Sequence, residues 1–224
     1  MVARDIWGVL PIKDYGTVMQ RLAAAMTQEE RTTLFAASVE DVLESLSACS
    51  SLAGVLVVTR DSRGKALADK YGARVVLEDE NRGHTAATSL GAEALAAEGR
   101  GGMLQVPGDM PLLDPTDIDA VLAAHLNAPA VTIAPSSDEM GSNCVVSSPP
   151  DFLPLRFGDN SFFPHCDAAR SLGVEPTIVR RPAFELDLDT PEDLARFVQE
   201  PSETRAYVYL QQAGIVHRVL RATG

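Results

Sequence analysis

Acidic residues at the ends of apolar segments are the feature of this sequence that most suggests chemistry. Asp187 and Asp189 alternate with Leu186 and Leu188, and on a β-strand this alternation puts both carboxylates on one face. Two such carboxylates repel each other unless a cation lies between them. Hard oxygen ligands suit Mg²⁺, with a substrate phosphate often completing the coordination shell. A solvated strand end is the plainer interpretation, but a second acid, Asp109, also ends an apolar run and favours a metal site.

Cationic residues near the first apolar segment predict contacts with an anion. Lys13 ends that segment and Arg21 follows eight residues later, so the two could flank a triphosphate. Spacing alone equally fits two surface cations. The chain has neither the Gly-x-x-x-x-Gly-Lys-Ser/Thr loop nor the Gly-x-Gly-x-x-Gly loop, so it lacks the usual signatures of P-loop and Rossmann proteins.

Three turn-like stretches carry small or hydroxyl side chains that suit an anionic ligand. Gly83 and Thr85 lie at the start of a helix after the third apolar segment, where small residues would let a ligand approach the backbone. A capped loop without a ligand explains them equally well. Residues 140–143 and 157–165 offer hydroxyls and free N–H groups, with Ser161 also a possible helix N-cap. Neither His84 nor His165 has a partner that the sequence identifies: each could contact a ligand, or His84 could lie on the surface and His165 pack in the core.

The elements that position these residues alternate between short strands and amphipathic helices. This predicts one α/β domain over residues 1–224, with a mixed, mostly parallel sheet covered by helices on both faces, a core over about residues 6–199 and a C-terminal helical tail over 200–224. The predicted strands are Ile6–Ile12, Gly54–Thr59, Arg74–Glu78, Met103–Val106, Ala130–Ala134, Asn143–Ser147 and Thr177–Asp187. The predicted helices include Met19–Ala25, one capped by Thr27 and Glu30, Ser62–Tyr71, Thr85–Ala97, Pro115–Leu126, Phe162–Leu172, Pro191–Gln199 and Glu203–Ala213. Lys13, Asp109 and Asp189 all fall at carboxyl ends of strands, where open α/β sheets bind ligands.

Composition narrows the class of protein. The 224 residues carry a net charge of −12, which argues against binding nucleic acid or a membrane through a basic surface. No apolar run approaches a membrane span and no signal peptide is evident, so a cytoplasmic location is expected. The cysteines, Cys49, Cys144 and Cys166, lack paired spacing and are expected to be buried thiols.

Taken in order, the motifs resemble a known enzyme family. The sequence contains Pro11-x-Lys13, Arg21-Leu22, Pro107-x-Asp109-x-Pro111-Leu112, Gly141-Ser142-Asn143, Phe157-Gly158-x-x-Ser161-Phe162-x-x-His165 and Leu186-Asp187-x-Asp189-Thr190-Pro191. This order resembles the phospholactate/phosphoenolpyruvate guanylyltransferases of coenzyme F-420 biosynthesis, from about Ile6 to Leu194. The resemblance implies the fold of nucleotide-diphospho-sugar transferases and the joining of GMP from GTP to 2-phospholactate, phosphoenolpyruvate or 3-phosphoglycerate, with release of pyrophosphate.

The resemblance also implies residue roles. Asp109, Asp187 and Asp189 match the family's Mg²⁺-binding aspartates, and Lys13 and Arg21 match its cationic positions. Ser142, Gly158 and Ser161 match positions that touch the acceptor acid, with His165 beside them. Pro11, Lys13, Gly83 and Thr85 are the expected nucleotide contacts. Met19 stands where the family commonly has a lysine, and His84-Thr85-Ala86-Ala87 replaces Leu-Asn-Ala-Ala.

The sequence is also compatible with other functions. A nucleotidyltransferase for molybdopterin or a sugar phosphate would usually open with a Gly-rich loop, which residues 10–16 do not form. A glycosyltransferase could use Asp-x-Asp, although usually nearer the middle of the chain. Met19 leaves room for a homologue that binds a nucleotide without turnover. A monomer and a homodimer are both compatible with the apolar residues beyond Gln199.

Overall fold

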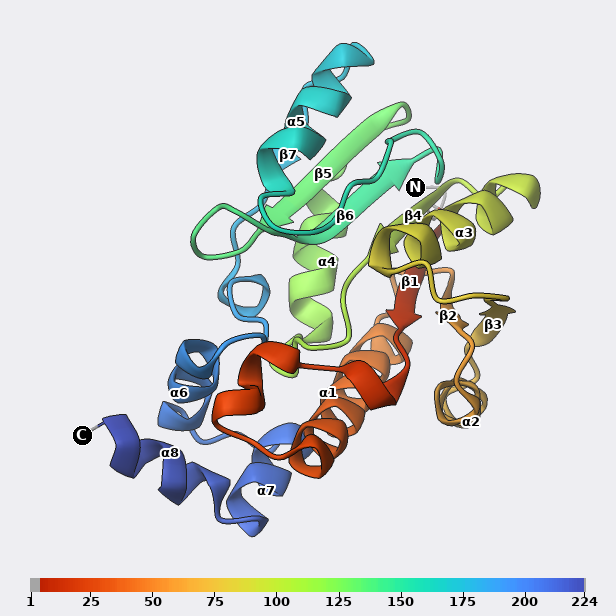
Figure 1. Ribbon diagram of the computed structural model, residues 1–224. Helices are drawn as coiled ribbons and strands as arrows, with labels where there is room; N and C mark the ends of the chain where they lie inside the picture. Colours follow the sequence, from red (N-terminus) through yellow and green to blue (C-terminus); the bar gives the residue numbers. More distant parts are fainter. Residues whose placement is uncertain (1–4, 224) are drawn as a thin grey trace.

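The computed structural model describes residues 5–223 and contains a seven-stranded sheet in the order β3-β2-β1-β4-β6-β5-β7 (Figure 1). Strand β6 runs antiparallel to β4 and β5, whereas the other neighbouring strands are parallel. The mixed, mostly parallel sheet predicted from the sequence is therefore confirmed. The strands are β1 Ile6–Ile12, β2 Gly54–Thr59, β3 Arg74–Leu77, β4 Gly102–Gln105, β5 Ala130–Pro135, β6 Ser142–Ser148 and β7 Thr177–Ile178.

Helix starts follow the capping signals in the sequence. Thr27 and Glu30 form a capping box at the start of α1, and Thr190 and Asp193 form another at the start of α6. Asp114 accepts from the Thr116 N–H and precedes a proline at the first position of α4. The helices are α1 Gln28–Ala48, α2 Ser62–Lys70, α3 His84–Ala97, α4 Pro115–Ala124, α5 Phe162–Ser171, α6 Pro191–Gln199, α7 Arg205–Gln212 and α8 Ile215–Thr223.

Both faces of the sheet are covered, as β1 illustrates. Leu10 and Ile12 belong to the apolar cluster that contains the buried residues of α1 and α4, while Trp7 and Val9 belong to the cluster that contains those of α3. Successive residues of a strand point to opposite faces, so the almost wholly apolar β1 is buried on both sides. Helix α5 packs over β5 and β6 in a third cluster.

Two sequence-based assignments of secondary structure were wrong. The strand predicted over Thr177–Asp187 is only the two-residue β7, because a 3-10 turn over Pro182–Phe184 interrupts the pattern. Consequently Asp187 and Asp189 do not lie on a strand. The helix predicted over Met19–Ala25 is a 3-10 segment over Gln20–Ala24, preceded by Met19 in the left-handed region at φ 49°. The tail over 200–224 was predicted to be helical, and besides α7 it contains α8, for which the sequence analysis gave no separate bounds.

No helix within residues 5–223 is long and apolar enough to cross a bilayer. Cys49, Cys144 and Cys166 are all buried free thiols, as predicted. Burial raises the pKa of Cys144 far above its usual range, so this thiol is chemically quiet.

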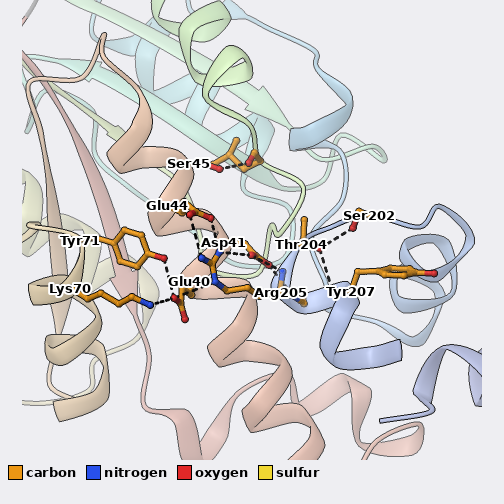
Figure 2. Close-up of polar contacts among 12 residues, drawn as sticks. Glu40, Asp41, Glu44, Ser45, Lys70, Tyr71, Ser202, Thr204, Arg205 and Tyr207 are labelled. Atoms are coloured by element: carbon orange, nitrogen blue, oxygen red, sulfur yellow. Dashed lines mark hydrogen bonds and ion pairs between the residues drawn. The ribbon is translucent and has the colours of Figure 1, made fainter. Parts of the chain in front are cut away.

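The C-terminal helices are tied to α1 by a polar network around Arg205 (Figure 2). The buried Asp41 carboxylate accepts from the backbone N–H groups of Arg205 and Ala206 at 2.9 and 3.0 Å, so it caps the first turn of α7 from a neighbouring helix. The Arg205 guanidinium lies 3.2 Å from Asp41 and 2.6 Å from Glu44. Figure 1 shows α6, α7 and α8 gathered at one end of the molecule beside α1.

Arg205→Ala should lower the free energy of unfolding by about 1–3 kcal/mol, because the mostly buried Asp41 loses its cation and Glu44 loses a charge-assisted hydrogen bond. This loss of stability is smaller than for a fully buried ion pair, because the arginine side chain is 38% exposed. Urea denaturation measures the change. Arg170→Ala is the matched control, since its partners Glu175 and Asp167 are exposed, and it should change stability by less than about 0.5 kcal/mol. Equal effects of the two substitutions would contradict the anchoring role of Arg205.

Candidate active site

A cavity of about 1020 Å³ opens at the edge of the sheet where β1 and β4 end. Because β6 is antiparallel to β4, its first residue lies at that same edge, which brings Ser142 toward Lys13 and Asp109. The residues predicted as site residues that line this cavity are Lys13, Arg21, Gly83, Thr85, Asp109, Ser142, Gly158, Ser161, Asp187 and Asp189. Segments far apart in the sequence thus converge at one place, as expected for an open α/β sheet.

Two of the predicted site residues do not line the cavity. Pro11 is buried in β1 and faces a small recess that shares Lys13, Gly83 and His84 with the main cavity. His165 is fully buried behind Ser142. The burial of His165 agrees with the expectation that it could pack in the core, and a direct contact of either residue with a ligand stays a prediction.

One backbone hydrogen bond joins the two acidic stretches. The Leu188 N–H donates to the Asp109 carbonyl at 2.8 Å, which places Asp187 and Asp189 on either side of the Asp109 turn. The Asn143 side-chain amide donates to Phe184 O at 2.8 Å and to Asp187 Oδ1 at 3.2 Å, so β6 fixes the second stretch. The arrangement therefore depends on a loop held by a few specific hydrogen bonds rather than on a strand ladder.

Asp109 carries the strongest sign of an incomplete charge balance. Its Oδ1 is buried and has no hydrogen-bond partner within residues 5–223. Burial, and then the nearby charge of Asp187, raise the pKa of Asp109 well above its usual range. Burial likewise raises the pKa of Asp187, against the lowering effect of the Asn143 hydrogen bond. These carboxylates fit a divalent cation, since a cation would satisfy the orphaned oxygen and remove the repulsion.

The carboxylates predicted to bind a metal do not form a compact group. Within the described residues no three His, Cys, Asp or Glu side chains are grouped closely enough to hold a metal ion. One reason is Arg21, whose Nη1 lies 2.8 Å from Asp189 Oδ2 and whose Nη2 lies 2.8 Å from Asp159 Oδ1. Arg21 therefore links two sides of the cavity, and its ion pair engages Asp189, the third aspartate predicted to bind a metal.

The opposite wall is built of hydroxyl groups. The Ser142 N–H donates to Ser161 Oγ at 2.9 Å, and the Ser142 hydroxyl lies 2.9 Å from His165 Nδ1. Ser161 precedes α5 but makes no side-chain cap, because its oxygen is turned to Ser142. Gly158 adopts φ 135°, a backbone conformation that favours glycine.

A third wall is formed at the start of α3. The Thr85 hydroxyl accepts from the Phe157 N–H at 3.0 Å, so this predicted nucleotide contact also fixes the loop that carries Gly158. His84 Nε2 lies 3.0 Å from Gln105 Nε2, and the His84 ring packs edge-on against Phe157. Burial, and then the charge of Lys13, lower the pKa of His84 to about 3, so His84 is neutral at physiological pH.

The structure adds residues to the cavity wall that the sequence analysis did not assign to the site. Asn143 contacts Asp187, Asp159 pairs with Arg21, and Glu185 and Asp193 also face the cavity. Asn143 follows Ser142 in the motif Gly141-Ser142-Asn143, so this motif could have indicated that Asn143 lies at the site. Asp193 belongs to the capping box of α6, which explains it as a structural residue, whereas Asp159 and Glu185 have no distinguishing pattern, because charged residues of this kind are usually surface groups.

Solved structures define the class to which this fold belongs. The chain superimposes on a candidate nucleotide-diphospho-sugar transferase from Desulfovibrio desulfuricans with a TM-score of 0.78, covering 96% of this chain and 98% of the other at 15% identity. It superimposes on 4-diphosphocytidyl-2C-methyl-D-erythritol synthase from Anaerococcus prevotii with a TM-score of 0.62, covering 93% and 97% at 13% identity. The fold is that of the nucleotide-diphospho-sugar transferases and cytidylyltransferases.

Sequence comparison then identifies the family. Residues 7–223 match the family described as guanylyl transferase CofC like, and the chain belongs to this guanylyltransferase family. It is 35% identical over 192 residues to phosphoenolpyruvate guanylyltransferase of Rubrobacter xylanophilus, covering 86% of this chain and 93% of the relative. It is 28% identical to 2-phospho-L-lactate guanylyltransferase of Methanothermobacter thermautotrophicus, covering 91% and 89%. The match includes the C-terminal tail, which lay outside the motifs recognised in the sequence.

Proposed function

We propose that this protein transfers GMP from GTP to a phosphorylated three-carbon acid, in a step of coenzyme F-420 biosynthesis. Phosphoenolpyruvate is the first acceptor to test, because relatives with 35% identity in Rubrobacter xylanophilus and Roseiflexus castenholzii are phosphoenolpyruvate guanylyltransferases. The 3-phospho-D-glycerate enzyme of Colwellia psychrerythraea is 27% identical over 83% of this chain, so that acid and 2-phospholactate are the alternatives. The product would be a guanosine diphospho-acid.

The observation that most supports this proposal is that one cavity combines hydroxyl donors with an excess of carboxylates. The acidic lining residues are Asp109, Asp138, Asp159, Glu185, Asp187, Asp189 and Asp193, whereas Lys13, Arg21 and Arg82 are the basic ones. An acidic cavity repels two anionic substrates unless metal cations enter with them. Nucleotide phosphates commonly arrive with Mg²⁺, so the lining fits a metal–triphosphate better than a free acid.

Asp109 and Asp187 would hold the metal, joined by Asp189 when Arg21 turns to the substrate. When bound, Mg²⁺ would offset the charge that concentrates on the phosphate oxygens during transfer. Lys13 lines the cavity and forms no hydrogen bond or ion pair within residues 5–223, and together with Arg21 it would bind the triphosphate. Gly83 and Thr85 would lie against the nucleotide, and Pro11 would support that wall from behind.

The proposed transfer is an in-line displacement. An oxygen of the acceptor phosphate attacks the α-phosphorus of GTP, the bond from that phosphorus to the bridging oxygen breaks, and pyrophosphate leaves with the electron pair. The attacking phosphate is already ionised at neutral pH, so no general base is required. Positioning and charge neutralisation would therefore account for most of the acceleration.

Pyrophosphate release tests the proposal directly. We expect release from GTP with one of the three acids, and we expect excess EDTA to abolish it and added Mg²⁺ to restore it, because the acidic cavity needs a cation. Undiminished release after metal removal would contradict the metal role. Release with a sugar phosphate or molybdopterin instead would assign another nucleotidyltransferase activity.

A non-catalytic nucleotide binder is the second possibility. Met19 is 8% exposed, lines the cavity and brings no charge to the triphosphate region. GTP binding without pyrophosphate release for any acceptor would favour this alternative. We further propose a cytoplasmic enzyme that acts as a monomer or homodimer, and size-exclusion chromatography with light scattering distinguishes those two states.

A further inference from the structure

His165 and Ser142 form a hydrogen-bonded pair whose proton direction the structure determines. The Arg156 backbone N–H lies 2.8 Å from His165 Nε2, and a backbone amide can only donate. Nε2 must therefore be the accepting nitrogen, so the ring proton of neutral His165 resides on Nδ1. Burial lowers the pKa of His165 to about 4, consistent with a neutral ring at working pH. Nδ1 lies 2.9 Å from Ser142 Oγ, so the Nδ1–H group donates a hydrogen bond to the serine oxygen.

The ring orientation is fixed from a second side. Phe157 packs edge-on against His165 with 5.0 Å between ring centroids, and the same phenyl ring contacts His84. His165 itself is fully buried and does not line the cavity. Its effect on a ligand must therefore pass through a neighbour, either Ser142 or the loop that carries Arg156 and Phe157.

The consequence for Ser142 is that its hydroxyl proton is left for another acceptor. Its oxygen already accepts a hydrogen bond from His165, and within residues 5–223 the hydroxyl hydrogen has no protein acceptor. The Ser161 hydroxyl hydrogen is likewise left for another acceptor, because the Ser161 oxygen accepts a hydrogen bond from the Ser142 N–H at 2.9 Å. Both serines line the cavity, so two adjacent hydroxyls are set to donate into it.

We propose that His165 is a positioning residue that holds the Ser142 hydroxyl as a donor, so that Ser142 and Ser161 together select an acceptor-only group such as a carboxylate. This inference rests on the proposed function and specifies how the acid end of the acceptor is recognised. A carboxamide would present N–H groups to these donors and would be rejected, whereas an ionised carboxylate accepts from both.

Two isosteric substitutions separate the two hydrogen bonds of His165. His165→Asn places an amide N–H near the position of Nδ1 and keeps the donor to Ser142, whereas His165→Gln places its amide oxygen near Nε2 and keeps only the contact with Arg156. We expect His165→Gln and His165→Ala to raise the KM for the acid roughly 10-fold or more, with the KM for GTP within about twofold. His165→Asn should recover most of the loss, and His165→Ala should add nothing to Ser142→Ala.

Rescue by glutamine rather than asparagine would overturn the inference, because His165 would then act only through the Arg156 loop. An equal rise of both KM values with a lower melting temperature would overturn it as well. The proton position has an independent readout: long-range ¹H–¹⁵N correlations of the imidazole should show the Nδ1–H tautomer between about pH 6 and 9. An Nε2–H tautomer would overturn the inference even if the wild-type protein turned over no acceptor, whereas an inactive wild type with the Nδ1–H tautomer would refute only the proposed function.

Discussion

Replacing Asp109 with asparagine should lower the rate of guanylyl transfer by at least about 100-fold while making the folded protein more stable at neutral pH. The loss of rate follows because the substitution removes a negative ligand from the proposed metal position, and groups that stabilise developing charge contribute on this scale. The gain in stability follows because the buried Asp109 Oδ1 has no hydrogen-bond partner within residues 5–223 and lies near Asp187. Activity and stability should therefore move in opposite directions.

The stability effect has a defined dependence on pH. Because burial and Asp187 raise the pKa of Asp109, the folded protein holds this proton more tightly than the unfolded chain, where an aspartate ionises near about 3.9. The group's contribution to stability is full below that ordinary pKa and is lost as pH rises toward the raised value. The asparagine variant lacks this loss, so its advantage should be small near pH 4 and greatest near pH 7–8.

Thermal unfolding across this pH range measures the effect. A gain on the order of 1 kcal/mol corresponds to about 2–4 °C in Tm for a chain of this size. Mg²⁺ should raise the Tm of the wild type near pH 8 more than that of Asp109→Asn. Asp167→Asn is the control, because its carboxylate is 75% exposed and outside the cavity lining. An Asp109→Asn enzyme with full rate would remove Asp109 from the metal site, and a less stable variant at pH 8 would show that the carboxylate is already satisfied.

Local signals in the sequence were sufficient for most of the fold. Thr27 and Glu30 predicted a capped helix start, and the structure contains that capping box. The nearly continuous apolar run over Ile6–Ile12 predicted a strand, and the structure contains β1 with those bounds, between β2 and β4. Signals of this kind involve only a few neighbouring residues, so they can be read from the sequence without knowledge of distant contacts.

The aspartate stretch shows where such reasoning stops. Leu186 and Leu188 are buried while Asp187 and Asp189 are partly exposed, so the alternation correctly predicted which side chains face the core. It did not predict the backbone, because an extended loop held by one hydrogen bond to Asp109 gives the same alternation as a strand. Period-two burial alone cannot distinguish the two.

Contacts between distant residues account for the other gaps. The partners of His165 are the Arg156 backbone and Ser142, 9 and 23 residues away, and only the packing of α5 against β6 brings them together. The tail was predicted to be helical, but α8 was given no bounds of its own, although Ile215, Val216 and Val219 have helical spacing. Here a usable signal existed, and Gly214 at φ 71° marks the break from α7.

Arg21→Ala should lower kcat/KM for GTP by about 100-fold and leave the free energy of unfolding within about 0.5 kcal/mol of wild type. The small effect on stability follows from exposure, since the arginine side chain is 56% exposed and its partner Asp159 is 88% exposed. The large effect on activity follows from geometry. Arg21 already holds two carboxylates at 2.8 Å with separate nitrogens, and the same two-armed guanidinium can bind two phosphate oxygens.

Two further substitutions distinguish substrate binding by Arg21 from a purely structural bridge. Arg21→Lys keeps the charge but not the two-armed geometry, so it should recover only part of the lost activity. Asp159→Asn weakens the bridge without touching the aspartates proposed to bind metal, and it should keep kcat within about twofold of wild type. If Asp159→Asn instead lost as much activity as Arg21→Ala, the bridge itself would be the functional feature, and Arg21 would act by holding the 156–161 loop. Because the guanidinium donates a hydrogen bond to Asp189, the proposed binding of Arg21 to the triphosphate would free that carboxylate for the metal.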